Sequence, residues 1–234
     1  MRVRTGRTGL VRGLRNGGRR MEPLGPATPM REVTSEAELV ELLGSPAPYA
    51  AQKARTSLHA VDREWLAHSP LCLIATSGSD GTCDVSPKGD PPGFVRVLDD
   101  RTVAIPERPG NKRLDGFRNV LVNPHVGLIH LLPGRGDTLR INGRARIVRE
   151  APFLDGMTVR GHRPAVALVV EIEEIFHHCS KAFLRSCAWD PGTWRPDALP
   201  GRARISKALE RPDEPLEVLE EHYGPSYAER LYEG

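Results

Sequence analysis

The residues best suited to chemistry in this chain are the basic and amide side chains of the segment 105–115. The segment opens with Ile105 and Pro106 and continues through a turn that carries four polar candidates: Arg108, Asn111, Lys112 and Arg113. Cationic and amide groups beside the free N–H groups of a helix start form a suitable site for a dianionic phosphate. A solvated basic turn is the alternative that these residues leave open.

A second cluster, in the segment 84–93, has the composition of a ligand-binding loop. It places Ser86 and Lys88 among two glycines and three prolines. Glycine lets the backbone approach a ligand closely, and proline stiffens a loop at little entropic cost. The same composition also fits a rigid turn that binds nothing.

Two further basic groups lie in the second half of the chain. Apolar and polar residues alternate between residues 138 and 148, which puts Arg140 and Asn142 on the polar face of a strand. Such side chains require water, a flat anion or a second subunit. Lys181 and Arg185 share one face if their segment is helical, which favours an anion between them. Trp189 is placed either to stack on a planar ring or to fill core.

Several motifs of well-known enzyme classes are absent from the sequence. It contains no GxGxxG, GxxxxGK[ST], HExxH or GxSxG pattern, and no evident nucleophile with its base. The four cysteines show no CxxC spacing, so buried free thiols are expected and no metal site is predicted. Any chemistry is therefore expected to belong to a cofactor.

The elements that must position these residues are mainly short strands joined by turns. Helical patterns cover residues 34–43 and 49–66, which we predict to form an N-terminal helical cap, and later residues 113–122, 203–209 and 214–222. Strand patterns cover residues 71–76, 83–86, 94–98, 102–105, 126–132, 138–148 and 165–175. This succession predicts a mainly β fold, an antiparallel and nearly closed barrel with flanking helices and a helical C-terminal tail.

Length and charge suggest one domain with extensions. We expect a barrel domain over residues 31–200, a helical appendage over 201–234 and a disordered basic leader over 1–30. The leader holds seven arginines within residues 1–20, so the +3 charge of the 234-residue chain becomes −4 for residues 21–234. The leader has two alternative interpretations: it is a targeting peptide, or the working protein starts near Met21 or Met30. We expect a cytoplasmic protein without nucleic-acid or membrane partners.

Taken in order, the motifs resemble those of the pyridoxamine 5′-phosphate oxidase-like flavoproteins. The resemblance is closer to a bacterial FMN-dependent subgroup with four motifs, which stand here at residues 86–90, 108–115, 136–143 and 179–189. It covers roughly residues 34–195. In that superfamily a strand ends at the flavin ring, a cluster of cationic and amide side chains holds the FMN phosphate, and an Asn-Pro turn leads into the next strand.

The resemblance implies an FMN-binding split barrel that forms a homodimer with flavin at the subunit interface. The implied cofactor-binding residues are Ser86, Lys88, Ile105, Pro106, Arg108, Asn111, Lys112, Arg113, Arg140, Asn142, Lys181, Arg185 and Trp189. It further implies an oxidoreductase that acts on an unidentified small molecule, with NAD(P)H as a candidate electron donor. Residues 201–234 lack the tryptophan and arginine motifs that hold the substrate in pyridoxamine 5′-phosphate oxidase itself, so that particular activity is not expected.

Two other classes of function stay open at this stage. The same barrel suits a non-catalytic module that binds flavin, haem or a deazaflavin for storage, sensing or delivery, because a fold does not decide a function. A structural dimer without flavin, whose basic patches meet acidic surface on the other subunit, is the second alternative.

Overall fold

The computed structural model describes residues 30–233 and divides the chain into two compact units, residues 1–46 and 47–234. In the first unit, helix α1 (Glu36–Leu43) begins at Ser35, whose Oγ accepts a hydrogen bond from the Glu38 N–H at 3.2 Å, and it ends at Gly44. This confirms the helix predicted over residues 34–43. The predicted leader lies outside the described residues, apart from Met30.

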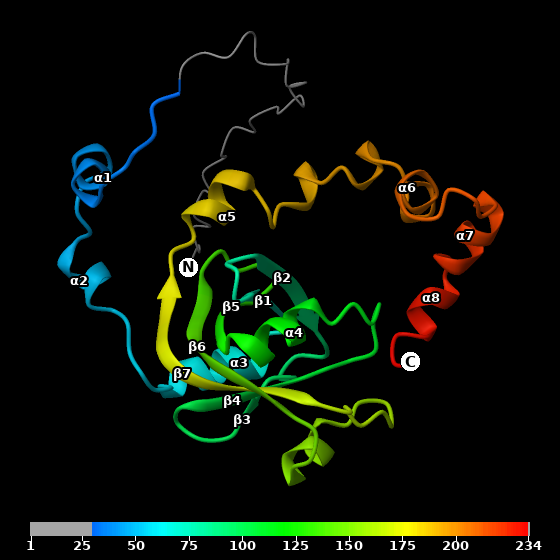
Figure 1. Ribbon diagram of the computed structural model, residues 1–234, viewed down its shortest axis with the longest axis horizontal. Coiled ribbons are helices and arrows are strands. Elements are labelled where there is room, and N and C mark those ends of the chain that lie inside the picture. Colours follow the sequence, from blue (N-terminus) through cyan, green and yellow to red (C-terminus); the bar gives the residue numbers. More distant parts are fainter. Residues whose placement is uncertain (1–29, 234) are drawn as a thin grey trace, which may run out of the picture. The chain divides into compact units, whose positions relative to one another are not determined.

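The second unit is built on one antiparallel sheet that curls around its core (Figure 1). Its strands are β1 (Leu71–Ser77), β2 (Cys83–Gly89), β3 (Arg96–Val97), β4 (Thr102–Pro106), β5 (His125–Leu131), β6 (Thr138–Val148) and β7 (Ala167–His178). They are hydrogen-bonded in the order β2-β1-β5-β6-β7-β4-β3. Because β2 and β3 do not pair with each other, the barrel stays open on one side. The predicted fold class, a mainly β split barrel, is confirmed.

Strand β6 shows how the sequence pattern produces the barrel. Leu139, Ile141 and Ala145 are buried in the core, while the arginines between them lie on the opposite face. A bulge against β7 follows Asn142, and a Cβ at Gly143 would lie 2.0 Å from the Glu171 carbonyl oxygen. Only glycine fits there, so the bend of this long strand pair depends on that residue.

The helix predicted over residues 49–66 is wrong in its middle. The structure has a short α2 (Pro48–Ala51) and a separate α3 (Ala60–His68). Between them the backbone of Arg55 forms a bridge with Ile175, with N···O distances of 3.0 and 2.7 Å. Pairing with a distant strand overrides the local helical pattern, and α3 starts anew at His59, whose backbone N–H donates to the Asp62 carboxylate.

The remaining helices lie beside the sheet or after it. They are α4 (Asp115–Val122), α5 (Lys181–Ser186), α6 (Arg202–Leu209), α7 (Leu216–His222) and α8 (Ser226–Glu229), with a 3₁₀ helix at Pro152–Met157. The two helices predicted after residue 200 are confirmed. The strand predicted over residues 94–98 shrinks to β3, because Phe94 and Val95 are both buried and do not alternate. Among residues 30–233, no helix combines the length and apolar character needed to cross a membrane.

Candidate functional site

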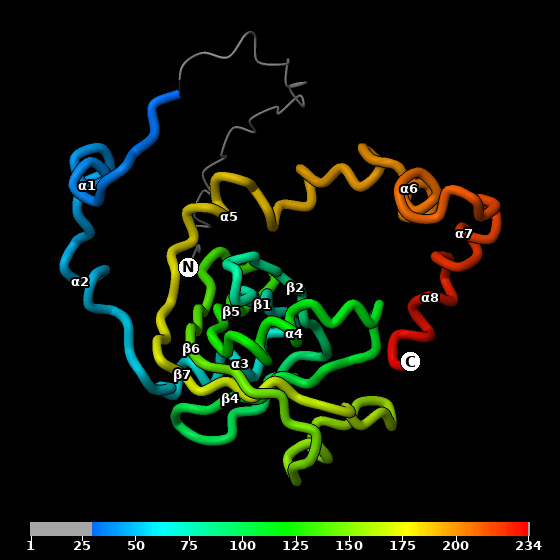
Figure 2. The backbone as a smooth tube through the Cα atoms, in the orientation of Figure 1, coloured from blue at the N-terminus to red at the C-terminus, as the bar shows by residue number. Residues whose placement is uncertain are grey.

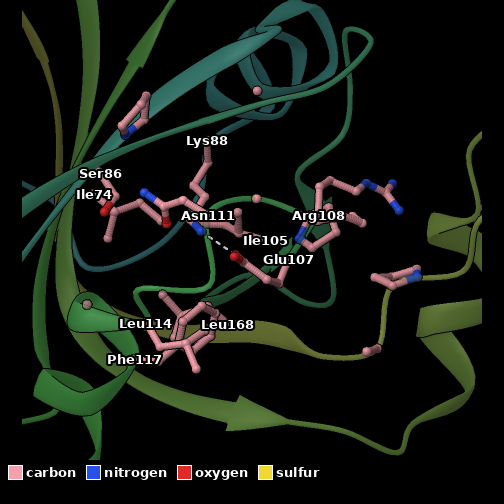
Figure 3. A pocket seen from close by; sticks show the side chains of 18 of the residues that line it. Ile74, Ser86, Lys88, Ile105, Glu107, Arg108, Asn111, Leu114, Phe117 and Leu168 are labelled. Atoms are coloured by element: carbon pink, nitrogen blue, oxygen red, sulfur yellow. Dashed lines mark hydrogen bonds and ion pairs between the residues drawn. The ribbon is translucent and has the colours of Figure 1, made fainter. Parts of the chain in front are cut away.

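The described part of the second unit contains a large cavity of about 1060 Å³, called here the main cavity (Figure 3). It lies where β2, β4, the start of α4 and the loops that follow β4 and precede β7 approach one another. Its lining comes from residues 74, 76, 84–89, 94, 105–117, 161–165 and 168, with Tyr232 near the chain end. The predicted segments 84–93 and 105–115 therefore face the same space.

The floor of the main cavity is apolar. Ile74 of β1, Ile105 of β4 and Leu168 of β7 are buried and line it, and Phe117 of α4 lies beside Leu168 (Figure 3). Ile105 and Leu168 are partners in the pairing of β4 with β7, so their side chains lie on the same face of the sheet. Such a floor suits the face of a planar ring.

Strand β2 supplies a polar wall. The alternate residues Asp84, Ser86 and Lys88 are half-buried along the main cavity, while the residues between them are exposed. The Lys88 ammonium forms an ion pair with the Glu107 carboxylate and lies 5.3 Å from the centre of the Phe117 ring. Lys88 therefore carries its charge at the edge of the apolar floor, which fits a hydrogen bond to a polar ring edge.

The loop between β4 and α4 forms the basic rim. The Oδ1 of Asn111 accepts from the Arg113 N–H at 3.1 Å, and Lys112 and Leu114 adopt left-handed backbone conformations with φ of 58° and 61°. Helix α4 consequently begins at Asp115, so the helix predicted from Arg113 starts two residues too early. The Arg113 Nε donates to Asp115 at 2.7 Å, and its guanidinium stays largely exposed at the rim.

Arg108 occupies a different position from the other cations of this loop. Its Nε donates to the Asp90 carboxylate at 2.5 Å, and its Nη atoms donate to the carbonyls of Met157 at 2.7 Å and His162 at 3.2 Å. The Arg108 side chain is 13% exposed and that of Asp90 is 1% exposed. The guanidinium thus ties three loops together in the cavity wall, and these partners satisfy most of its donors.

Eight of the thirteen predicted cofactor-binding residues line the main cavity: Ser86, Lys88, Ile105, Pro106, Arg108, Asn111, Lys112 and Arg113. The remaining five, from β6 and the region of α5, do not line it. Arg140 lies 5.1 Å from the Phe176 ring centre, and its Nε is buried without an acceptor among the described residues. Asn142 donates to Glu174 at 2.6 Å.

The segment around α5 follows the end of β7 and lies against the turn between β5 and β6. The Trp189 ring stacks on Phe183 with centroids 5.6 Å apart, and its Nε1 donates to the Arg135 carbonyl at 2.7 Å. Lys181 and Arg185 lie on α5 and are exposed. Trp189 therefore holds α5 against the β5–β6 turn within its own chain, and the three predicted residues are not joined to the main cavity.

Some residues of the main cavity were not predicted from the sequence. Glu107 follows the predicted pair Ile105 and Pro106, and its position between two predicted ligands was a usable signal. His162 and Tyr232 carry no such signal, because they come from distant segments and meet the cavity only through folding. Within residues 30–233, no group of three or more His, Cys, Asp or Glu side chains is arranged to hold a metal ion.

Part of this chain matches the model of a known protein family. The family model described as pyridoxamine 5′-phosphate oxidase matches residues 58–179, which include every strand of the barrel and most of the main cavity. The chain belongs to this family. Comparison with curated protein sequences gave no match.

Solved structures with a similar fold match about half of this chain. HupZ of Group A Streptococcus is 21% identical over 51% of this chain and 93% of that chain, with a TM-score of 0.42. An FMN-binding protein from Syntrophomonas wolfei is 14% identical over 51% and 89%, with a TM-score of 0.39. HutZ, the heme storage protein from Vibrio cholerae, is 15% identical over 52% and 93%, with a TM-score of 0.36.

Proposed function

We propose that the main cavity binds FMN and that the protein is an FMN-dependent oxidoreductase acting on a small molecule. The observation that carries this proposal is the combination, in one cavity, of an apolar floor with a rim of cationic and amide donors. Flavin mononucleotide matches both parts of the cavity, because its ring system is flat and largely apolar while its phosphate is dianionic. Membership of the pyridoxamine 5′-phosphate oxidase family supports a flavin as the ligand.

The residues present fit both ends of this cofactor. Asn111, Lys112 and Arg113 offer an amide and two cations at the rim, which is the donor set that a phosphate requires. Ile105, Pro106 and Leu168 border the floor where a ring would lie. The volume of about 1060 Å³ lies just above the range for small-molecule sites, about 300–1,000 Å³, so a second small molecule has room beside FMN.

Bound FMN would supply hydride or electron transfer at its N5 atom. The chain itself would position the ring, exclude water from the apolar floor and neutralise the phosphate. Lys88 is the candidate donor to the polar edge of the ring, because its ammonium lies beside Phe117 on the floor. Glu107 holds that ammonium in place through the ion pair.

We also propose a homodimer in which residues outside the main cavity complete the site of the partner. Arg140, Asn142, Lys181, Arg185 and Trp189 belong to this second group, and the buried Arg140 Nε has no acceptor among the described residues. Light scattering of the purified protein tests the dimer. A dimeric mass, together with loss of FMN in the double variant Lys181→Glu/Arg185→Glu, is the expected result, and a monomer that retains FMN would contradict it.

The spectrum of protein purified without added cofactor is the most direct test of the ligand. We expect the near-ultraviolet and visible bands of an oxidised flavin, whereas a Soret band would indicate haem and a colourless protein would favour a structural role. Anaerobic addition of NADH or NADPH then separates an enzyme from a carrier. An oxidoreductase should lose its flavin absorbance and recover it with an acceptor, whereas a storage module should retain it.

The phosphate assignment has its own test. Arg113→Glu should weaken FMN binding by at least about tenfold, a change of about 1.4 kcal/mol, while riboflavin, which lacks the phosphate, should bind as before. Arg118→Glu is the matched control, since Arg118 also pairs with Asp115 but does not line the main cavity. Equal FMN affinities of the two variants would place the phosphate elsewhere.

A further inference from the structure

The last described residues of the chain contribute to the wall of the main cavity. In Figure 2 the red end of the tube comes back beside the green segment that follows β4. Tyr232 lines the cavity together with that segment, and it contacts Asp90, which lies 142 residues earlier in the sequence. Tyr232, close to the last of the described residues, is therefore part of the candidate site.

Tyr232 is held at the cavity by several contacts. Its hydroxyl donates to the Asp90 Oδ1 at 2.5 Å, and its ring stacks on His162 with centroids 5.7 Å apart. The guanidinium groups of Arg108 and Arg160 each lie 5.7 Å from the centre of the same ring. The hydrogen bond to Asp90 raises the pKa of the Tyr232 phenol, and burial adds to this effect, so the hydroxyl stays protonated and able to donate.

The rest of the C-terminal segment is bonded to itself. Arg202 pairs with Glu210, Arg211 pairs with Glu214, and Arg230 donates to backbone carbonyls of the same segment. Among the described residues from 199 to 233, Tyr232 makes the one side-chain hydrogen bond that reaches the barrel. The hydrogen-bonded attachment of this segment to the cavity therefore depends on a single side chain.

We propose that residues 226–233, called here the C-terminal strap, close one side of the main cavity, and that Tyr232 anchors the strap and thereby controls ligand access. The inference rests on the proposed function, because FMN is the probe of access. Asp90 is suited to the role, since its buried carboxylate is fixed by Arg108 through one oxygen and receives Tyr232 through the other. The hydrogen bond of Tyr232 to the charged Asp90 should favour the closed strap over the open one by roughly tenfold or more. Because only this hydrogen bond between the described strap residues and the barrel has to break, the strap can open while the barrel stays folded.

The test compares full-length Tyr232→Ala and Tyr232→Phe with the control Tyr227→Phe, which alters an exposed tyrosine of the same strap. The measurement is the rate of FMN dissociation, followed by the rise of flavin fluorescence after dilution. We expect release to be about tenfold faster for Tyr232→Ala, with a smaller increase for Tyr232→Phe, which keeps the ring, and no change for the control. An unchanged rate in Tyr232→Ala overturns the inference and leaves the proposed function intact.

A second measurement does not depend on flavin. Arg230 lies two residues before Tyr232, so trypsin should cut after it faster in Tyr232→Ala than in the parent protein if Tyr232 holds the strap in place. Equal cleavage rates overturn the anchoring role. If no variant binds FMN, the proposed function fails, while faster cleavage still supports the docking of the strap.

Discussion

Lys88 of β2 and Glu107, the residue after β4, form an ion pair within the main cavity. The two residues come from strands near opposite ends of the sheet order, so the open barrel brings them together across its gap. Both side chains are about a quarter exposed, at 22% and 26%. The pair therefore places one positive and one negative charge beside the floor on which we propose that the flavin ring lies.

Glu107→Gln should raise the reduction potential of bound FMN. Removing the carboxylate leaves the Lys88 charge uncompensated, which favours the more negative reduced flavin, and we expect a shift on the order of 30 mV, about 1.4 kcal/mol for two electrons. A potentiometric titration of the two proteins measures it. Lys88→Gln should shift the potential in the opposite direction, and equal shifts of the same sign would contradict the assigned position of the pair.

Substitution of Arg108 should lower the stability of the protein, whereas substitution of Arg113 should weaken ligand binding. Arg108→Ala leaves the buried Asp90 carboxylate without its cation, so we expect a loss of about 3 kcal/mol in the free energy of unfolding. Arg113→Ala, at the exposed rim, should leave the melting temperature unchanged and weaken FMN binding. Thermal unfolding without flavin and FMN titration distinguish the two effects. A stable Arg108→Ala protein would show that Asp90 does not need its partner.

His130 should make the barrel sensitive to acid. It lies on β5 inside the core, both ring nitrogens lack partners among the described residues, and burial lowers its pKa from 6.5 to about 4. Because the unfolded state binds the proton more readily, this contribution to stability is complete above pH 6.5 and is lost as the pH falls toward 4. The whole loss in the free energy of unfolding is on the order of 3 kcal/mol.

Denaturant unfolding at several pH values measures this effect. His130→Leu lacks the titrating ring, so the difference in stability between it and the parent protein should change between pH 6.5 and 4. A difference that stays constant over that range would show that burial does not lower the pKa of His130 in the folded state.

The four cysteines should differ in reactivity. Cys72 is buried on β1, and burial raises the pKa of its thiol to about 12 although Lys88 opposes the shift. Cys83, Cys179 and Cys187 are exposed, so the expectation of buried thiols is wrong for these three. Cys83 is the first residue of the edge strand β2, and the other two lie beyond the barrel strands. A thiol reagent should label them in the native protein and reach Cys72 only after unfolding, because the thiolate is the reactive form. Labelling of all four in the native state would contradict the buried position.

Local patterns in the sequence predicted most of the barrel. The alternation over residues 138–148 predicted β6 with the bounds that the structure has, because a strand with one buried face must repeat every second residue. The helix predicted over residues 49–66 failed at Arg55, whose backbone pairs with Ile175. That partner lies 120 residues later in the chain, and no local pattern records it.

The sequence by itself determined the basic turn over residues 105–115, the strand that leads into it and the polar face of β6, and these features indicated a flavin site. Only the tertiary structure decided that Arg108 ties the wall together while Arg113 faces the rim, since both are arginines of one turn. It also decided that Tyr232 joins the cavity and that Arg140 does not. Side-chain roles of this kind depend on which distant groups lie within hydrogen-bonding distance, and that is fixed by the packing of the whole chain.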